Sequence, residues 1–285
     1  MKRKPQAVMT RAISSIFGLP FVAVGRQPKE MSSKRFQELA SSPPILVLLG
    51  DAVIYVGQAF DLSPHRIAVT AMAIAIDAPF DLQMPGDDHP SSRDFAIIPA
   101  RTLHQLRAKG IIAFVYTGMP HQQISVVDHG RAAALANRIA DAAGDAAAAL
   151  KHAATLLALL GVTDQHRLAA IAIPLDKMKR APAEVPTAAH GAALAGMPTQ
   201  SFRRHIKAHT GMTFGQHRRS AMVNAAIRSL ALGDNLTGAA LDAGFSSSAH
   251  FSSAVRQMFG LAPSTLLRSG LRIVTDKEIE GTAAN

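Results

Sequence analysis

The chain of 285 residues contains no cysteine and no tryptophan. The lack of cysteine excludes a disulfide framework, a thiolate zinc site and a cysteine nucleophile. No run of about 18 to 20 apolar residues is present, as a membrane-spanning helix would need. The sequence also lacks a phosphate-binding glycine loop, a nucleophile elbow and a zinc-binding helix motif. We therefore expect a cytoplasmic protein that is not an enzyme, with no membrane partner, no catalytic residue, no metal and no cofactor.

Acidic residues are also scarce, because 20 Asp and Glu stand against 30 Lys and Arg, for a formal net charge of +10. Apolar residues make up 48 % of the chain, which excludes a wholly disordered protein. The length suits two domains. A strongly basic chain favours a polyanionic partner, nucleic acid before an anionic membrane.

The first 40 residues form an uncertain N-terminal segment. Basic residues Lys2 to Lys4 precede an uncharged stretch from Ala12 to Gly25, which faintly resembles a secretory signal. Translation from Met31 is the alternative, in which case residues 1–30 are upstream sequence. The sequence leaves both open, so residues 1–40 stand outside the predicted domains.

Residues 43–118 have the pattern of a β-rich domain. Short runs rich in Val, Ile and Phe, such as Ile45–Leu49 and Ile111–Tyr116, are separated by turn residues. Several short strands at this spacing suggest a sandwich or barrel. The alanine-rich stretch Ala132–Ala149 then predicts one or two packed helices. We expect a β-rich domain with trailing helices at residues 41–161.

The rest of the chain predicts an all-α domain of short helices at residues 162–270, followed by a flexible tail at residues 271–285. Pro174 interrupts the first of these helices and should end or kink it. No acidic residue lies between Glu184 and Asp234, a span with six Lys or Arg. A solvated helical face normally mixes signs, so this stretch favours contact with phosphates.

Two helix-turn-helix signatures lie in this domain. In the first, Gly196 supplies the turn, because glycine adopts a positive φ at little cost. In the second, Gly244 supplies the turn, and Ser246 or Ser247 caps the helix that follows. The stretch Phe214–Leu232 predicts a helix between the two units, about 28 Å long at 1.5 Å per residue. One turn of DNA is about 34 Å, so both units could reach successive major grooves on one face.

Four short motifs follow one another within residues 164–268. They are Phe202-x-Arg204-x-Ile206-Lys207-x-x-Thr210-Gly211, Ala225-x-x-x-x-Leu230, Ala240-x-x-x-Gly244-Phe245 and Phe259-Gly260-x-x-Pro263-Ser264. In this order and spacing they resemble the DNA-binding domain of AraC/XylS-type bacterial transcription regulators. The resemblance implies promoter DNA and RNA polymerase as partners, and an activator rather than a repressor.

The resemblance also implies which side chains read DNA. Arg203 or Arg204 could pair with guanine through two hydrogen bonds, and Gln200 with adenine. A phosphate contact or an intramolecular ion pair is the alternative for either arginine. Position 253 is commonly arginine in the family and is serine here, so we expect the first unit to carry most of the sequence discrimination. The expected DNA-binding set is Thr199, Gln200, Arg203, Arg204, Lys207, Ser247, Ser248, His250, Ser253 and Arg256.

Family members of this layout carry an N-terminal cupin-like jelly roll that senses a small molecule, and residues 43–118 resemble one weakly. The stretch Pro99–His104 matches the cupin pattern Pro-x-Gly-x-x-His, with Arg101 in the place of the glycine. A metal cupin needs about three histidines and one carboxylate, and at most His65 and His104 remain here. The effector pocket is therefore expected to include His65, Arg66 and His104. The alternative is that the histidines are ordinary residues of the surface or of a pocket rim.

The resulting prediction is a multidomain α+β protein. A β-rich, cupin-like jelly roll with trailing helices would sense a small-molecule effector or mediate homodimer formation. An all-α domain with two helix-turn-helix units would bind promoter DNA. Two alternatives stay open: a non-specific architectural DNA-binding protein, and a catalytic cupin fused to a DNA-binding domain.

Overall fold

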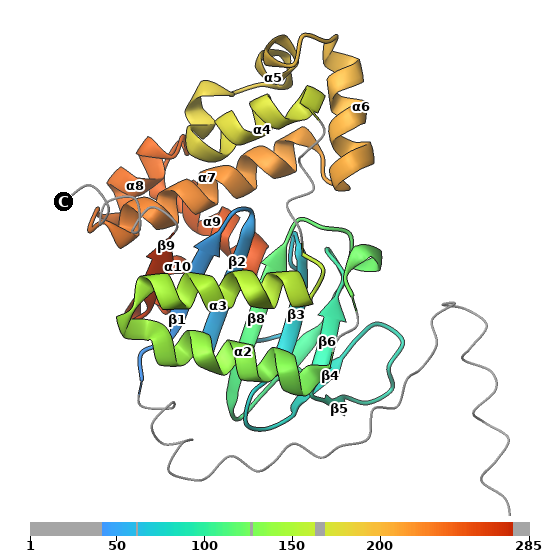
Figure 1. Cartoon of the computed structure of the whole chain (residues 1–285), viewed down its shortest axis with the longest axis vertical. Coiled ribbons are helices and arrows are strands. Elements are labelled where there is room, and N and C mark those ends of the chain that lie inside the picture. Colours follow the sequence, from blue (N-terminus) through green and yellow to red (C-terminus); the bar gives the residue numbers. More distant parts are fainter. Residues whose placement is uncertain (1–41, 61, 126–127, 163–168, 276–285) are drawn as a thin grey trace, which may run out of the picture.

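The computed structural model describes residues 42–60, 62–125, 128–162 and 169–275 (Figure 1). The uncertain segment of residues 1–40 lies outside these ranges. A β-rich N-terminal domain with two covering helices lies beside a helical C-terminal domain, which confirms the predicted two-domain α+β architecture. No helix of the described residues is long and apolar enough to cross a membrane.

The larger sheet of the N-terminal domain has six strands in the order β6-β3-β8-β2-β1-β9. Neighbouring strands are antiparallel except for β1 and β9, which are parallel. The smaller sheet has three strands in the order β5-β4-β7. The strands are β1 (Ile45–Leu49), β2 (Ala52–Gln58), β3 (Thr70–Ala75), β4 (Phe80–Gln83), β5 (Ser91–Arg93), β6 (Phe95–Ile98), β7 (Gln105–Arg107), β8 (Ile111–Thr117) and β9 (Arg272–Thr275).

Both faces of the larger sheet are buried, so its strands are apolar at successive positions. In β1, for example, Ile45 and Val47 pack in one core and Leu46 and Leu48 in another. Helices α2 (His129–Asp141) and α3 (Ala146–Leu159) cover the first of these faces (Figure 1). The other face packs against the smaller sheet and part of the helical domain.

The C-terminal domain contains seven α-helices within the described residues. Their bounds are α4 (Ala169–Arg180), α5 (Ala188–Leu194), α6 (Thr199–Thr210), α7 (Phe214–Ala231), α8 (Leu236–Asp242), α9 (Ser248–Phe259) and α10 (Pro263–Arg268). Of the two outcomes predicted for Pro174, an end or a kink, the helix does not end there, because α4 continues to Arg180. Proline removes one backbone hydrogen bond, but Ile171, Leu175 and Met178 of this helix are buried in one core.

The two helix-turn-helix units belong to different cores. In the first unit, Phe202 and Ile206 pack with residues of α4 in a core confined to the helical domain. In the second unit, Phe251, Val255 and Phe259 share one core with the strands of the N-terminal domain. The second unit is therefore built into the N-terminal domain.

Strand β9 strengthens this connection and differs from the tail expected at residues 271–285. It pairs with β1 over Ile45 to Leu48, and the Arg272 N–H donates to the Pro44 carbonyl at 2.8 Å. Val274 is fully buried on the face covered by α2 and α3, whereas Ile273 packs on the opposite face. A strand that begins four residues after α10 thus returns the chain to the N-terminal sheet. Residues 276–285 lie outside the described ranges.

The placement of β9 predicts a large cost for charging its buried position. Val274→Asp would place a carboxylate without a partner in the core, so we expect it to lower the free energy of unfolding by several kcal/mol. Leu232→Asp is the control, because Leu232 is 78 % exposed; a carboxylate at the C-terminal end of its helix should cost no more than about 1 kcal/mol. Urea unfolding measures both values, and equal losses would contradict the placement of β9.

Candidate DNA-binding surface and ligand pocket

The first helix-turn-helix unit consists of α5, a turn at Gly196 and α6. The Thr187 side chain caps α5 by accepting from the His190 N–H. Gly196 has a φ of 62°, as the sequence predicts for the turn. A Cβ on Gly191 would lie 2.6 Å from the Phe202 ring, so glycine in α5 allows α6 to approach closely.

Helix α6 has one buried and one exposed face. Phe202, Ile206 and Thr210 follow at intervals of four residues and are all buried. The exposed side chains include four of the predicted DNA contacts, and Thr199 is half-buried. The four exposed residues are Gln200, Arg203, Arg204 and Lys207.

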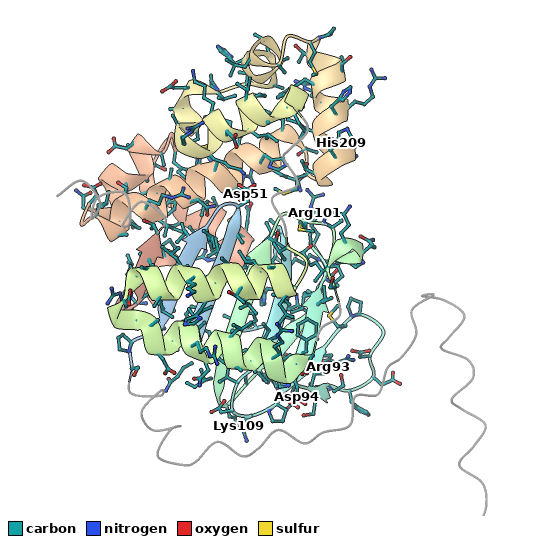
Figure 2. The ribbon with its side chains drawn as sticks, in the orientation of Figure 1. Asp51, Arg93, Asp94, Arg101, Lys109 and His209 are labelled. Carbon is teal, nitrogen blue, oxygen red and sulfur yellow. The ribbon has the colours of Figure 1, made fainter. Side chains whose placement is uncertain are left out.

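The cationic groups of α6 are available for contact with DNA. Among the described residues, Arg203, Arg204 and Lys207 make no ion pair. The Arg204 Nη2 lies 3.5 Å from the Ser201 Oγ, which is too long for a strong hydrogen bond. Side chains of α6, where His209 is labelled in Figure 2, extend from the outer edge of the helical domain. The intramolecular ion pair left open for the arginines is therefore absent from the described residues.

Helix α7 sets the distance between the two units, which lie toward its opposite ends (Figure 1). It spans 18 residues, or about 27 Å. A capping box of Thr213 and Gln216 starts the helix, and Leu232 is its C-cap. The predicted helix ended one residue later. This length is compatible with DNA contacts about one helical turn apart.

The second unit consists of α8, a turn at Gly244 and α9. Asn235 caps α8, and the Ser247 Oγ accepts from the His250 N–H at 3.1 Å to cap α9. His250, Ser253 and Arg256 are exposed on α9, whereas Ser248 is half-buried. Arg256 is the single cation of this helix, so the second unit presents shorter donors than the first.

The comparison with protein families concerns the helical domain. Residues 192–269 match a family model described as a helix-turn-helix domain. They form an AraC-type helix-turn-helix domain. The predicted resemblance is thereby confirmed for this part of the chain. The chain matches none of the curated proteins with which it was compared.

Solved structures show the same architecture over a longer stretch. An apo variant of ToxT from Vibrio cholerae aligns with a TM-score of 0.50 at 12 % identity, covering 77 % of this chain and 97 % of that one. ToxT bound to an unsaturated fatty acid aligns with a TM-score of 0.41 at 12 % identity, covering 76 % and 94 %. A transcriptional regulator with an AraC-type DNA-binding domain from Chromobacterium violaceum aligns with a TM-score of 0.32 at 22 % identity, covering 34 % and 88 %. The chain therefore has a ToxT-like two-domain fold.

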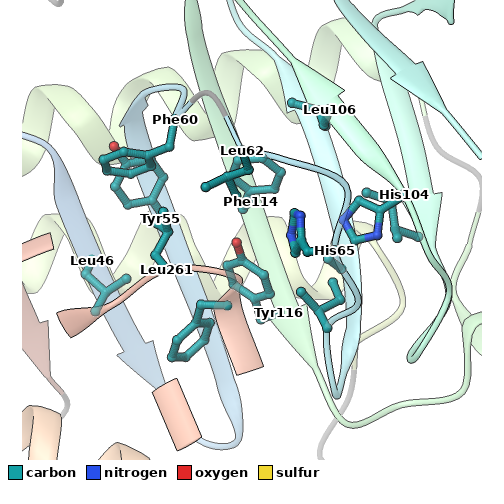
Figure 3. Close-up of a pocket in the computed structure, with 14 residues that line it drawn as sticks. Leu46, Tyr55, Phe60, Leu62, His65, His104, Leu106, Phe114, Tyr116 and Leu261 are labelled. Atoms are coloured by element: carbon teal, nitrogen blue, oxygen red, sulfur yellow. The ribbon is translucent and has the colours of Figure 1, made fainter. Parts of the chain in front are cut away.

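A pocket lies on the face of the larger sheet that contacts the second unit (Figure 3). Tyr55 and Tyr116 line it from the larger sheet, Leu106 from the smaller sheet, and Phe259 and Leu261 from the end of α9 and the residues that follow. Its cavity of about 40 Å³ holds only a few water molecules. A larger cavity of about 360 Å³ separates α3 from α4 and α7.

The structure brings together two of the three predicted effector residues. The backbones of His65 and His104 pair through two hydrogen bonds of 3.0 Å, and their rings lie 4.5 Å apart at the pocket. Arg66 is exposed and does not line the pocket. Its Nη1 donates to the Arg101 carbonyl at 2.7 Å. Arg101 itself has a φ of 64°, the backbone conformation favoured by the glycine of the cupin pattern.

The sequence analysis missed the two tyrosines of the pocket. Tyr55 and Tyr116 lie on adjacent strands, and burial raises the pKa of both phenols. The Tyr55 hydroxyl donates to the Gln58 carbonyl at 2.7 Å. Strand alternation could have placed each tyrosine on a face of its strand. It could not have placed Phe259 against Tyr116, because 143 residues separate them in the chain.

The histidine pair predicts a dependence of stability on pH. Burial lowers the pKa of His104 from 6.5, and the nearby His65 acts in the same direction. The folded protein then binds fewer protons at His104 than the unfolded chain. This contribution to stability is complete above about pH 6.5 and is lost as the pH falls below the unfolded pKa.

We predict that His104→Gln reduces the loss of stability between pH 7.5 and pH 5.5, because it removes this proton uptake. Urea unfolding at the two pH values measures the difference, with the exposed variant His209→Gln as the control. An unchanged pH dependence in His104→Gln would rule out His104 as its source.

Proposed function

We propose that this transcription regulator binds a specific DNA sequence and that a small molecule in the N-terminal domain controls the binding. The observation that carries the proposal is the AraC-type domain, whose α6 exposes amide and guanidinium groups without ion-pair partners among the described residues. Activation by contact with RNA polymerase belongs to the proposal through the family resemblance alone.

The chemistry of the two recognition helices supports unequal roles. Gln200, Arg203 and Arg204 can each make two hydrogen bonds to a base. Ser248 and Ser253 reach less far, and Arg256 suits a phosphate contact. We infer that the first unit carries most of the discrimination between sequences and that the second unit mainly anchors the protein.

Selection of binding sites from random duplex DNA, with the full chain at two salt concentrations, tests this function. The expected result is a motif of two half-sites about one helical turn apart, with more information in one half-site than in the other. An architectural DNA-binding protein would instead select no motif, and its affinity would collapse as salt rises.

A single substitution on α6 tests the assignment of base contacts. Arg204→Ala should weaken binding to the selected site by about 1–3 kcal/mol and relax the preference at one base position, with a smaller loss on random DNA. Lys207→Ala is the comparison, because loss of a phosphate contact weakens binding to the selected site and to random DNA alike. Fluorescence anisotropy gives the affinities. An equal loss on both DNAs for Arg204→Ala would count against base reading by this residue.

Control by a small molecule is supported by the wall that the pocket shares with α9. The Ala68 N–H donates to the Gln257 carbonyl at 2.8 Å, and a Cβ on Gly260 would lie 2.5 Å from the His65 Nε2. A ligand larger than the cavity of about 40 Å³ must displace the residues at the end of α9. Such a ligand would shift the populations of two positions of the second unit and so alter DNA contact.

The alternative of a catalytic cupin gains no support. Within the described ranges, no group of three or more His, Asp or Glu could hold a metal ion. ToxT binds an unsaturated fatty acid in one of the structures aligned above, which agrees with a small-molecule role for this fold. The ligand of the present chain is inferred from its own pocket below.

Two glycine variants test the coupling between the pocket and the second unit. Gly260→Ala should weaken protection of the second half-site in a DNA footprint several-fold, because the new methyl group meets His65 and displaces α9. Gly233→Ala is the matched control, since it has a positive φ of 97° but open space around the Cβ position. Protection of the first half-site should persist in both variants. If the two variants gave the same footprint, the coupling would be excluded.

A further inference from the structure

The Tyr116 hydroxyl faces the pocket and has no hydrogen-bond partner among the described residues. Its residue is 9 % exposed, and its ring lies between Phe114 and Phe259 at centroid distances of 5.8 Å and 4.9 Å. Figure 3 shows the hydroxyl directed into the pocket. No described residue forms a hydrogen bond with it, whereas the Tyr55 hydroxyl has the Gln58 carbonyl. The hydroxyl therefore keeps a free hydrogen-bonding position in a mainly apolar pocket, so a ligand that supplies the partner would gain affinity.

The histidine pair supplies acceptors in the same pocket. The His65 Nδ1 lies 2.9 Å from the Ser63 carbonyl oxygen, and the His104 Nδ1 lies 3.0 Å from that of Thr102. A carbonyl oxygen only accepts, so both Nδ1 atoms must carry the proton. In the neutral rings each Nε2 is therefore an acceptor. The pocket thus offers one phenol hydroxyl and imidazole acceptors.

The remaining lining, as far as the structure describes it, is apolar and carries no formal charge. None of the fourteen described residues around the pocket is Lys, Arg, Asp or Glu. A carboxylate ligand would lose its hydration without gaining a permanent cationic partner, which is costly. A hydroxyl group, in contrast, can donate to an imidazole Nε2 and accept from Tyr116.

We propose that the pocket binds an uncharged, apolar molecule with one hydroxyl group, a phenol or an alcohol, and that Tyr116 and the histidine pair hold this hydroxyl. The proposal rests on the proposed function, because it takes the same pocket as the effector site. Phe259 and Leu261 occupy the space next to the cavity of about 40 Å³, so the apolar part of the ligand displaces them and moves the end of α9.

Calorimetric titration of the full chain with three matched probes tests the ligand class. The probes are 4-ethylphenol, its methyl ether and 4-ethylbenzoate, which share the apolar part and differ in the polar group. The expected result is that the phenol binds at least ten-fold more tightly than either of the others. Equal or tighter binding of the benzoate, or no binding of the phenol, would overturn the proposal.

Two tyrosine variants test the residue. In Tyr116→Phe the affinity for 4-ethylphenol should fall to that of the methyl ether. Tyr55→Phe is the matched control, since it removes a hydroxyl that is already paired. Tyr55→Phe should reduce the affinity for the phenol by less than Tyr116→Phe does.

Unchanged affinity for the phenol in Tyr116→Phe would overturn the role of this residue. Failure here is distinguishable from failure of the proposed function. Site selection on random DNA and the Gly260→Ala footprint require no ligand, so both can succeed while the phenol fails to bind.

Discussion

The contact on which the structure depends is the packing of the end of α9 and of β9 against the larger sheet. The Phe259 ring meets Tyr116 edge to face at 4.9 Å, and Val274 is buried under α2 and α3. Through these contacts the second helix-turn-helix unit shares the core of the N-terminal domain. Apolar burial in this shared core stabilises the contact between the two parts.

The first helix-turn-helix unit packs differently from the second. Its residues form a separate core with those of α4, and a cavity of about 360 Å³ separates α4 and α7 from α3 and the turn after β1. The ion pair of Lys179 and Asp51 at 3.2 Å crosses this boundary with both side chains partly exposed, and such pairs contribute little to stability. The unit whose side chains are best suited to reading bases is therefore the one less firmly joined to the pocket. Reading and regulation would then lie in separate units.

Local signals in the sequence could predict much of this arrangement. Gly196 and Gly244 marked both turns, and the motifs around Phe202 and Phe245 fixed the order of the helices. The cupin pattern has a glycine at the position of Arg101, and Arg101 adopts a positive φ. The pattern therefore marked a position where the backbone conformation favours glycine. Each of these features depends on a few neighbouring residues, which is why sequence alone reveals them.

Features that depend on distant contacts were not predictable in the same way. Residues 272–275 form a strand only by pairing with β1, which is distant in the sequence. From the sequence alone they were therefore predicted to be a tail. Pro174 stays within α4 because Ile171 and Leu175 are packed against other helices. The pocket combines Tyr116 with Phe259 of another domain. The assignment of individual DNA contacts stays a prediction from resemblance.

Amide hydrogen exchange of the full chain, resolved for α6, α9 and β2, tests the central claim most directly, since it measures the opening free energy of each element. A shared core predicts that α9 and β2 open together with the same free energy and that α6 opens at a lower one. Equal opening of α6 and α9, both below β2, would contradict the account, because the two helix-turn-helix units would then form one body apart from the sheet.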